Sequence, residues 1–272
     1  MMSNRLKKSG FNLLELLLVM AIIAILAAML LPVLSKTKLR ALQLQCLANL
    51  SQLVLAEKMY LDDNWDSCIQ YDFSGDSHLW MGRLIDYQGQ LNTVRLCPAA
   101  TDTNHTRAFG TADQAWRIRS QAPTTLWQGG YGLNGWLYTN LTNQNGGLPA
   151  VDLDKVFQKD TAVMLPAQTP VFADSIWVDA WPRTNNVPPD NLYFGTQRSG
   201  PGHFQGSLGR MVIDRHGGIP AHNAPAMVDT DERLPGAINV ACTDGHVELS
   251  SLENLWNFYW NRTWVPPNPR PR

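Results

Sequence analysis

The chain has 272 residues, with 22 Lys and Arg against 23 Asp and Glu, 44% hydrophobic residues and a mean hydropathy of -0.20. This composition excludes a disordered chain and a collagen-like repeat, disfavours a polytopic membrane protein, and does not indicate a nucleic-acid binder. The averages nevertheless combine two unlike parts, because basic and apolar residues are concentrated near the N-terminus.

The first 34 residues consist of a short basic stretch followed by a long apolar one. Residues 1–10 contain Arg5, Lys7 and Lys8 and no acidic residue, and Glu15 is the single charged residue between positions 11 and 34. As a helix, residues 11–34 would be about 36 Å long, which is enough to cross a hydrocarbon core of about 30 Å. The sequence therefore predicts a single transmembrane helix with its basic end in the cytoplasm and the rest of the chain on the other side.

Two simpler interpretations of this segment are a cleaved secretory signal peptide and a plain anchor helix. The apolar block is long for a signal peptide, and the stretch Pro32–Ser35 is a poor cleavage site. A plain anchor does not explain Glu15, because an ionisable group inside a membrane segment is costly and usually functional.

The run from Lys7 to Glu15 resembles the class III signal of type IV pilins and type II secretion pseudopilins. It has a basic leader, a Gly before a Phe, a Glu four residues after that Phe, and a long apolar helix. The resemblance implies cleavage between Gly10 and Phe11 by a prepilin peptidase and N-methylation of Phe11. It also implies that Glu15 pairs with the N-terminal amine of a neighbouring subunit during assembly. Asn12 differs from the Thr that is common at this place in the family.

Residues 35–62 continue the helix as an amphipathic segment. Polar residues such as Lys38, Gln45, Gln52 and Lys58 occupy one side, and turn-forming residues end the helix at 62–64. The other side carries a stripe at helical spacing that we expect to pack on a globular head, formed by Leu39, Leu42, Cys46, Leu50, Leu53, Ala56 and Tyr60.

Residues 63–272 form the head, which is rich in loops and contains all ten Trp residues. We expect a fold of the α+β class, with the long N-terminal helix packed on an antiparallel β-sheet as in pilins. We expect the two long stretches 99–128 and 181–209 to be irregular and 140–147 to form a polar loop. The expected elements are a short helix at 78–87, strands near 130–138, 169–173 and 210–214, two strands within 237–250, a final helix at 251–261 and a mobile tail at 266–272.

The C-terminal part carries a second resemblance, to large pseudopilin-like proteins with a motif of His, a spacer and Asp-Gly. Residues 239–247 match the end of that motif. However, 27 residues separate His216 from Asp244, which is much more than the usual spacer, so residues 219–236 are interpreted as an insertion. His216 is the expected counterpart of the motif His, and His222 is the alternative.

All four cysteines follow the membrane segment, so this topology places them in an oxidising compartment. They allow three pairings. We favour Cys46–Cys97, because Cys46 lies on the stripe that faces the head and Cys97-Pro98 opens a turn. Cys68–Cys242 then follows by elimination. The alternative is that at least one pair remains as buried free thiols.

A divalent metal ion is the one cofactor that the sequence suggests. Asp174, His216, Asp244 and His246 combine carboxylate and imidazole groups that can bind such an ion, although two His disfavour calcium. The alternative is structural: Asp244 shapes a turn with Gly245, and His216 is a hydrogen-bonded core residue.

The sequence contains no nucleotide-binding, serine hydrolase or zinc protease motif, so we do not expect an enzyme. The resemblance implies a structural subunit that forms homo- or hetero-oligomers with pilin-like subunits. Its other implied partners are prepilin peptidase, an inner-membrane assembly platform and membrane lipid. It would be a single-pass inner-membrane protein with a periplasmic head, and would then enter a periplasmic or surface filament. The alternative is a membrane-anchored binding module or adhesin for a polysaccharide or secreted substrate, and an anchored enzyme comes third.

Overall fold

The structure is a computed structural model that describes residues 12–72, 79–89, 92–101, 103, 105–119, 125–139, 141, 150–197 and 207–272. The leader at residues 1–10, including Gly10, and the expected new N-terminus Phe11 lie outside the described residues. Most of the expected polar loop at 140–147 lies outside them too.

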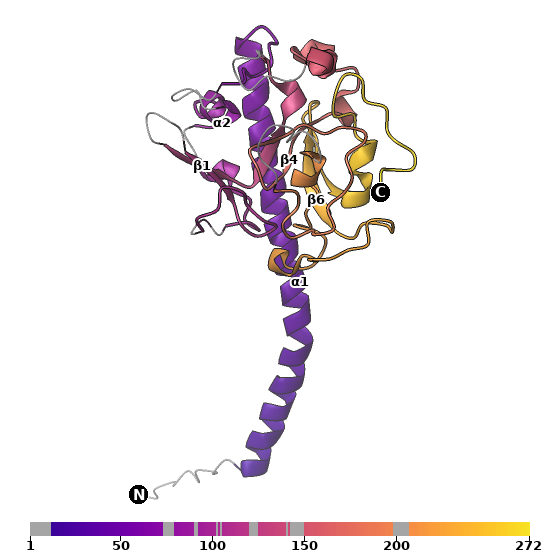
Figure 1. The fold of residues 1–272 in the computed structure, drawn as a ribbon. Helices are drawn as coiled ribbons and strands as arrows, with labels where there is room; N and C mark the ends of the chain where they lie inside the picture. The colour runs from indigo at the N-terminus through magenta and orange to yellow at the C-terminus, as the bar shows by residue number, and fades with distance from the viewer. Residues whose placement is uncertain are drawn as a thin grey trace, which may run out of the picture.

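One long helix, α1 (Leu13–Asp63), forms a stem that runs along the head and then extends far beyond it (Figure 1). Asn12 caps its start and Asn64 its end, which confirms the predicted end of the helix. Pro32 lies inside α1 without ending it, and the helix curves gently below the head, as expected where one backbone hydrogen bond is missing. The apolar half is long and hydrophobic enough to cross a membrane, and none of it is buried against the head.

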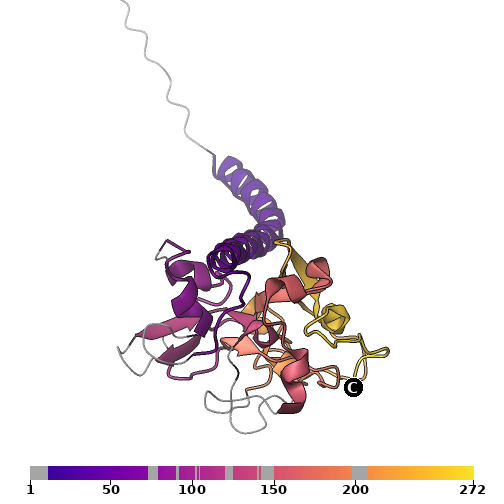
Figure 2. The ribbon, with the colours of Figure 1, turned by 90° about the horizontal axis from the view of Figure 1, so that it is seen from above.

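The second half of α1 packs on one side of the head, as the view along the helix shows (Figure 2). Most of the predicted stripe is buried there, which confirms the amphipathic interpretation. Lys58 was expected on the solvent side, but its ammonium group pairs with Asp160 of the head at 2.9 Å. The buried stripe residues are Cys46, Leu50, Leu53, Ala56 and Tyr60.

The head is built on a five-stranded sheet whose strands are arranged in the order β5-β3-β4-β6-β7. Three of the four neighbouring pairs are antiparallel and the β3–β5 pair is parallel, so the sheet is mixed but mostly antiparallel. Helix α1 packs on β4, β6 and β7. The chain therefore has the predicted α+β architecture. The strands are β3 (Tyr131–Asn134), β4 (Pro170–Asp174), β5 (Asp179–Ala180), β6 (Ala237–Cys242) and β7 (Val247–Ser251).

The remaining elements differ in part from those expected. The short helix α2 (Leu79–Leu84) and the hairpin of β6 and β7 are confirmed, whereas the expected final helix is a 3-10 helix, η9 (Leu252–Asn257). No strand forms at 210–214. A separate hairpin of β1 (Trp116–Arg119) and β2 (Leu126–Gly129) lies in a stretch that was expected to be irregular.

The C-terminal tail is held in place, so the expectation of a mobile tail was wrong. Its Arg270 guanidinium is bound by Glu253 at 3.0 Å and donates to the carbonyl oxygens of Thr230 and Glu232. Arg270 is itself buried. A buried guanidinium with these three partners fixes the segment that carries it, because releasing the tail would break an ion pair and two hydrogen bonds at once.

Tryptophan side chains fill the core of the head and tie loops to it. Trp80 donates its indole N–H to the carbonyl of Val178 at 2.7 Å, and Trp136 donates to that of Pro182 at 2.7 Å. Large aromatic groups of this kind bury much apolar area while satisfying a loop carbonyl. The fully buried Trp residues are Trp80, Trp116, Trp136, Trp256 and Trp260.

Candidate functional site

The membrane half of α1 presents one carboxylate at its first turn. Glu15 accepts a hydrogen bond from the Asn12 backbone N–H at 3.1 Å. The Asn12 side-chain oxygen accepts one from the Leu14 backbone N–H at 3.3 Å. This reciprocal pair is a capping box, which satisfies backbone N–H groups that a helix start leaves free. Asn12, the departure from the family pattern, therefore has a local structural role. Glu15 and the apolar residues around it are exposed and available to other chains or to lipid.

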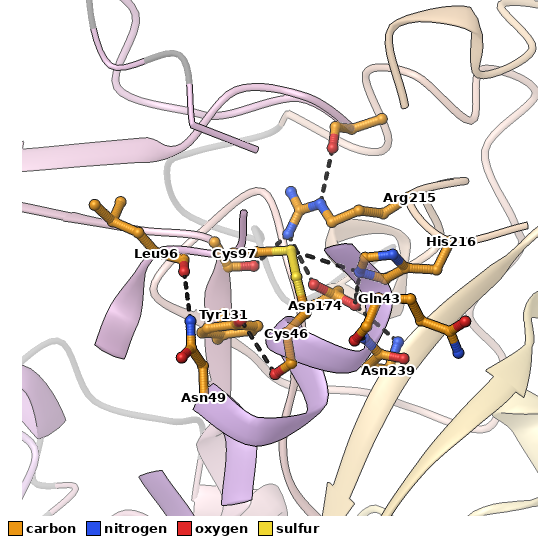
Figure 3. The surroundings of a disulfide bond; sticks show 12 residues. Gln43, Cys46, Asn49, Leu96, Cys97, Tyr131, Asp174, Arg215, His216 and Asn239 are labelled. Atoms are coloured by element: carbon orange, nitrogen blue, oxygen red, sulfur yellow. Dashed lines mark hydrogen bonds and ion pairs between the residues drawn. A yellow bond between two sulfur atoms is a disulfide. The ribbon is translucent and has the colours of Figure 1, made fainter. Parts of the chain in front are cut away.

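A disulfide between Cys46 and Cys97 joins α1 to the head, as predicted (Figure 3). Their Cα atoms are 5.1 Å apart, and 51 positions separate them in the sequence. Two hydrogen bonds support the same contact: the Asn49 amide donates to the Leu96 carbonyl at 2.9 Å, and the Tyr131 hydroxyl donates to the Cys46 carbonyl at 3.3 Å. The upper half of α1 is thus fixed to the head by both covalent and polar contacts.

Cys68 and Cys242 do not pair with one another, so the pairing by elimination was wrong. Cys68 lies just after α1, where its backbone N–H donates to the Gln158 carbonyl, whereas Cys242 ends β6. Both are buried free thiols. Burial raises the pKa of the Cys68 thiol, and it raises that of Cys242 to about 12, so both side chains stay protonated and unreactive.

Next to the disulfide, a buried carboxylate is held between two basic side chains. Asp174, at the end of β4, lies 3.1 Å from the Arg215 guanidinium and 3.3 Å from Nε2 of His216, and it accepts from the Asn239 backbone N–H at 2.7 Å. Burial alone would raise the pKa of the Asp174 carboxyl. The charge and hydrogen bond of His216, then Arg215 and Asn239, outweigh burial and hold that pKa below its usual value.

Arg215 is a structural hub that the sequence analysis did not single out. Besides Asp174 it donates to the carbonyl oxygens of Thr111, Ala112 and Gly130, which lie in two other loops. A planar guanidinium with five donors suits such a junction. The one sequence feature that could have drawn attention to Arg215 is its position directly before His216, the expected motif histidine.

The four residues suggested as metal ligands do not form one site. Asp174 and His216 are buried together, whereas Asp244 and His246 pair with each other at 2.6 Å on the exposed turn between β6 and β7. The two pairs lie toward opposite ends of β4, because Cys242, just before that turn, is opposite Pro170. That spacing is about 13 Å at the usual strand rise. The turn itself follows the structural alternative: Gly245 has φ of +99°, a conformation that favours glycine.

One other group has metal-ligand character among the described residues. The sulfur atoms of Cys46 and Cys97 and a ring nitrogen of His216 lie within 4.8 Å of one another. Sulfur binds metals strongly as a thiolate, and the disulfide removes both thiolates. In this oxidation state the group is a structural cross-link with a histidine beside it, with Nε2 of His216 at 3.5 Å from Sγ of Cys97.

Comparison with known proteins identifies the N-terminal segment. Residues 5–31 match the family model for the prokaryotic N-terminal methylation motif. No curated protein and no solved structure matches the chain. The chain therefore carries a prepilin-type signal on a long hydrophobic helix and is pilin-like in architecture, and the match covers the signal and part of the membrane half of α1.

Proposed function

We propose that the chain is a structural subunit, a pilin or pseudopilin, of a filament of the type IV pilus or type II secretion kind. The observation that carries this proposal is the combination of the methylation motif with an apolar helix half that the described part of the head leaves uncovered. Such a surface needs a lipid or protein partner, because exposed apolar area of this size is unfavourable in water. Membrane lipid would cover it first, and the helices of neighbouring subunits would cover it in the filament.

In this proposal prepilin peptidase cleaves between Gly10 and Phe11, and the new Phe11 amine is methylated. Glu15 then pairs with the Phe11 amine of a neighbouring subunit as the helices pack together. A carboxylate in a low-dielectric bundle requires a cation nearby, and the cleavage creates one. The subunit would wait in the inner membrane with its head in the periplasm.

Processing is tested by co-expression with a prepilin peptidase, followed by intact-mass measurement. We expect a mature chain that begins at Phe11 and carries one added methyl group, and a Gly10→Val variant should remain uncleaved. A mature N-terminus near residue 35 would identify an ordinary secreted protein and refute the proposal.

Assembly is tested by Glu15→Gln, which removes the charge and keeps the shape of the side chain. We expect this variant to insert in the membrane normally but to be depleted from sheared or isolated filaments. Normal incorporation of the variant into filaments would contradict the pairing. A head that is never found in any filament would instead favour an anchored binding module.

A further inference from the structure

A cleft of about 730 Å³ lies at the base of the head, at the point where α1 leaves it. One wall is formed by residues 35–43 of α1, and the other by residues 215–222, which include the 3-10 helix η8 (Ala221–Asn223). Figure 1 shows this orange turn beside α1 at the lower end of the head. The volume is in the range of small-molecule binding sites.

The cleft lies at the level of the membrane surface if α1 is anchored as proposed above. The apolar run of α1 ends at Leu34, and Ser35 and Lys36, which follow, already line the cleft. The inference therefore rests on the proposed membrane anchoring. Any ligand that reaches the cleft from the membrane side would be part of the lipid headgroup layer.

Three cationic side chains of α1 line the cleft. Lys36, Lys38 and Arg40 line it and are exposed, and no ion pair joins them to an acidic side chain within the described part of the chain. Lys36 and Lys38 are two positions apart, so they flank the head-facing stripe on opposite sides of the helix. Among the described lining residues Asp113 is the one carboxylate, and it already accepts from the Thr111 hydroxyl at 2.8 Å.

The position of these cations is unusual for the side of the membrane that they occupy. Basic residues close to a membrane helix normally collect on the cytoplasmic side. This chain carries three before the apolar run, Arg5, Lys7 and Lys8, and three directly after it. Cations placed against this tendency, with no acidic partner among the residues that the structure describes, indicate an anionic ligand on the head side.

The cleft also carries apolar side chains. Leu39 and Leu42 of α1 line one wall, and the exposed Ile219 lines the other. A cleft that combines apolar and cationic side chains fits an amphiphile with an anionic end better than a free inorganic ion. Phosphodiester oxygens are good acceptors for Lys and Arg, and glycerol and upper acyl carbons suit the aliphatic side chains.

We propose that this cleft binds the headgroup of an anionic phospholipid from the leaflet beneath the head. Lys36 and Arg40, one turn apart on the same side of α1, bind the lipid phosphate together, and Lys38 binds the phosphate of a second lipid on the other side. The glycerol regions lie on Leu39, Leu42 and Ile219. Bound lipid on the two sides of α1 holds the head at a set height and orientation on the membrane while the subunit waits for assembly.

The test uses the full chain in a nonionic detergent, with phosphatidylglycerol or phosphatidylcholine added and complexes counted by native mass spectrometry. We expect phosphatidylglycerol to bind at least about tenfold more tightly than phosphatidylcholine. A triple variant, Lys36→Gln, Lys38→Gln and Arg40→Gln, should lose up to about 100-fold of phosphatidylglycerol affinity, since each basic residue near a membrane surface contributes about a factor of five.

The matched control removes the same charge from exposed positions elsewhere on the head: Arg119→Gln, Lys159→Gln and Arg262→Gln. This control should keep the preference for phosphatidylglycerol. Equal affinity for the two lipids, or an equal loss in both triple variants, would overturn the proposal. Displacement of the lipid by soluble glycerol phosphate at comparable concentration would overturn it in favour of a small phosphoester site.

Flotation with phosphatidylcholine vesicles separates this proposal from the membrane anchoring on which it rests. The wild-type chain and both triple variants should float equally, because α1 alone holds them in the bilayer. If the chains float but native mass spectrometry shows no preference for phosphatidylglycerol, the headgroup site alone is refuted. Failure of all three chains to float refutes the anchoring and the headgroup site together.

Discussion

Glu57 makes the stability of the head depend on pH in a direction opposite to that of most carboxylates. It lies on the head-facing side of α1, is 3% exposed, and its Oε2 atom has no hydrogen-bond partner among the described residues. Burial is the main cause that raises the pKa of Glu57 to about 8. The charge of Lys58 opposes this rise, and that of Asp160 adds to it. At neutral pH the carboxyl group is therefore protonated in the folded chain.

The sign follows from proton linkage. Below its ordinary pKa of 4.5 the carboxyl is protonated in both folded and unfolded chains and costs nothing. Between pH 4.5 and pH 8 the unfolded chain loses the proton first, so folding stability falls by about 1.4 kcal/mol per pH unit. Above the folded pKa the loss is complete at roughly 5 kcal/mol. The contribution of Glu57 to folding stability is therefore highest below pH 4.5, where the carboxyl is protonated in both states, and falls as the pH rises through the pKa of the folded chain.

The perturbation is Glu57→Gln, which keeps the shape of the protonated side chain and cannot ionise. We measure urea unfolding of the full chain in nonionic detergent by tryptophan fluorescence, at intervals from pH 4 to pH 9. The stability of the variant relative to wild type should rise by roughly 5 kcal/mol over this range. Glu232→Gln, at an exposed position, is the control and should show no such trend. A difference between Glu57→Gln and wild type that does not change with pH would show that Glu57 does not titrate with a raised pKa in the folded chain.

Three further substitutions test other contacts of the head. Cys97→Ser should cost about 2–4 kcal/mol of unfolding free energy by opening a long disulfide loop, and adding a reductant to that variant should change nothing further. Arg215→Ala should cost about 3–5 kcal/mol in urea unfolding, because Asp174 loses one of its two basic partners and three loop carbonyl groups lose their donor; a loss below about 1 kcal/mol would contradict the hub role. Arg270→Ala should make the C-terminal tail sensitive to limited proteolysis with little change in the unfolding of the core. If the tail of that variant resists the protease as well as the wild-type tail does, Arg270 is not what holds the tail in place.

The features predicted correctly from the sequence are those with strong local signals. The apolar run and the 3.6-residue stripe define α1 over its whole length, and Gly245 marks the turn of the β6–β7 hairpin. Cys46 and Cys97 could be paired because one is on the buried stripe and the other begins a turn. In each case the signal lies in the few residues around each position, even where, as for Cys46 and Cys97, the contact joins distant segments.

The errors arise where the local pattern does not decide the structure. The apolar run Met211–Ile213 is fully buried and resembles a strand, yet the backbone N–H groups of Met211 and Val212 donate back to Leu208 rather than across a sheet. The tail was expected to be mobile from its proline content, but its anchor Glu253 is 17 positions from Arg270. Strand β5 has two residues, which is too short for any periodicity to show.

The four residues expected to share a metal ion do not come together, for a related reason. Asp174 and His216 are close in space, but Arg215 and the Asn239 amide already satisfy the carboxylate. The place of Arg215 beside His216 in the sequence does not reveal that its guanidinium reaches Asp174, 41 positions away. Asp244 and His246 are two positions apart on one exposed turn, and sheet geometry keeps that turn away from Asp174.

The disulfide also decides how the molecule responds to tension. A subunit pulled between its N-terminal helix and its C-terminal end passes force from Cys46 directly to Cys97, so the residues between them carry none of it. Those 51 positions correspond to about 170 Å of extended chain that cannot be released until the bond is reduced. A fibre built from such subunits would be less extensible in an oxidising environment than in a reducing one.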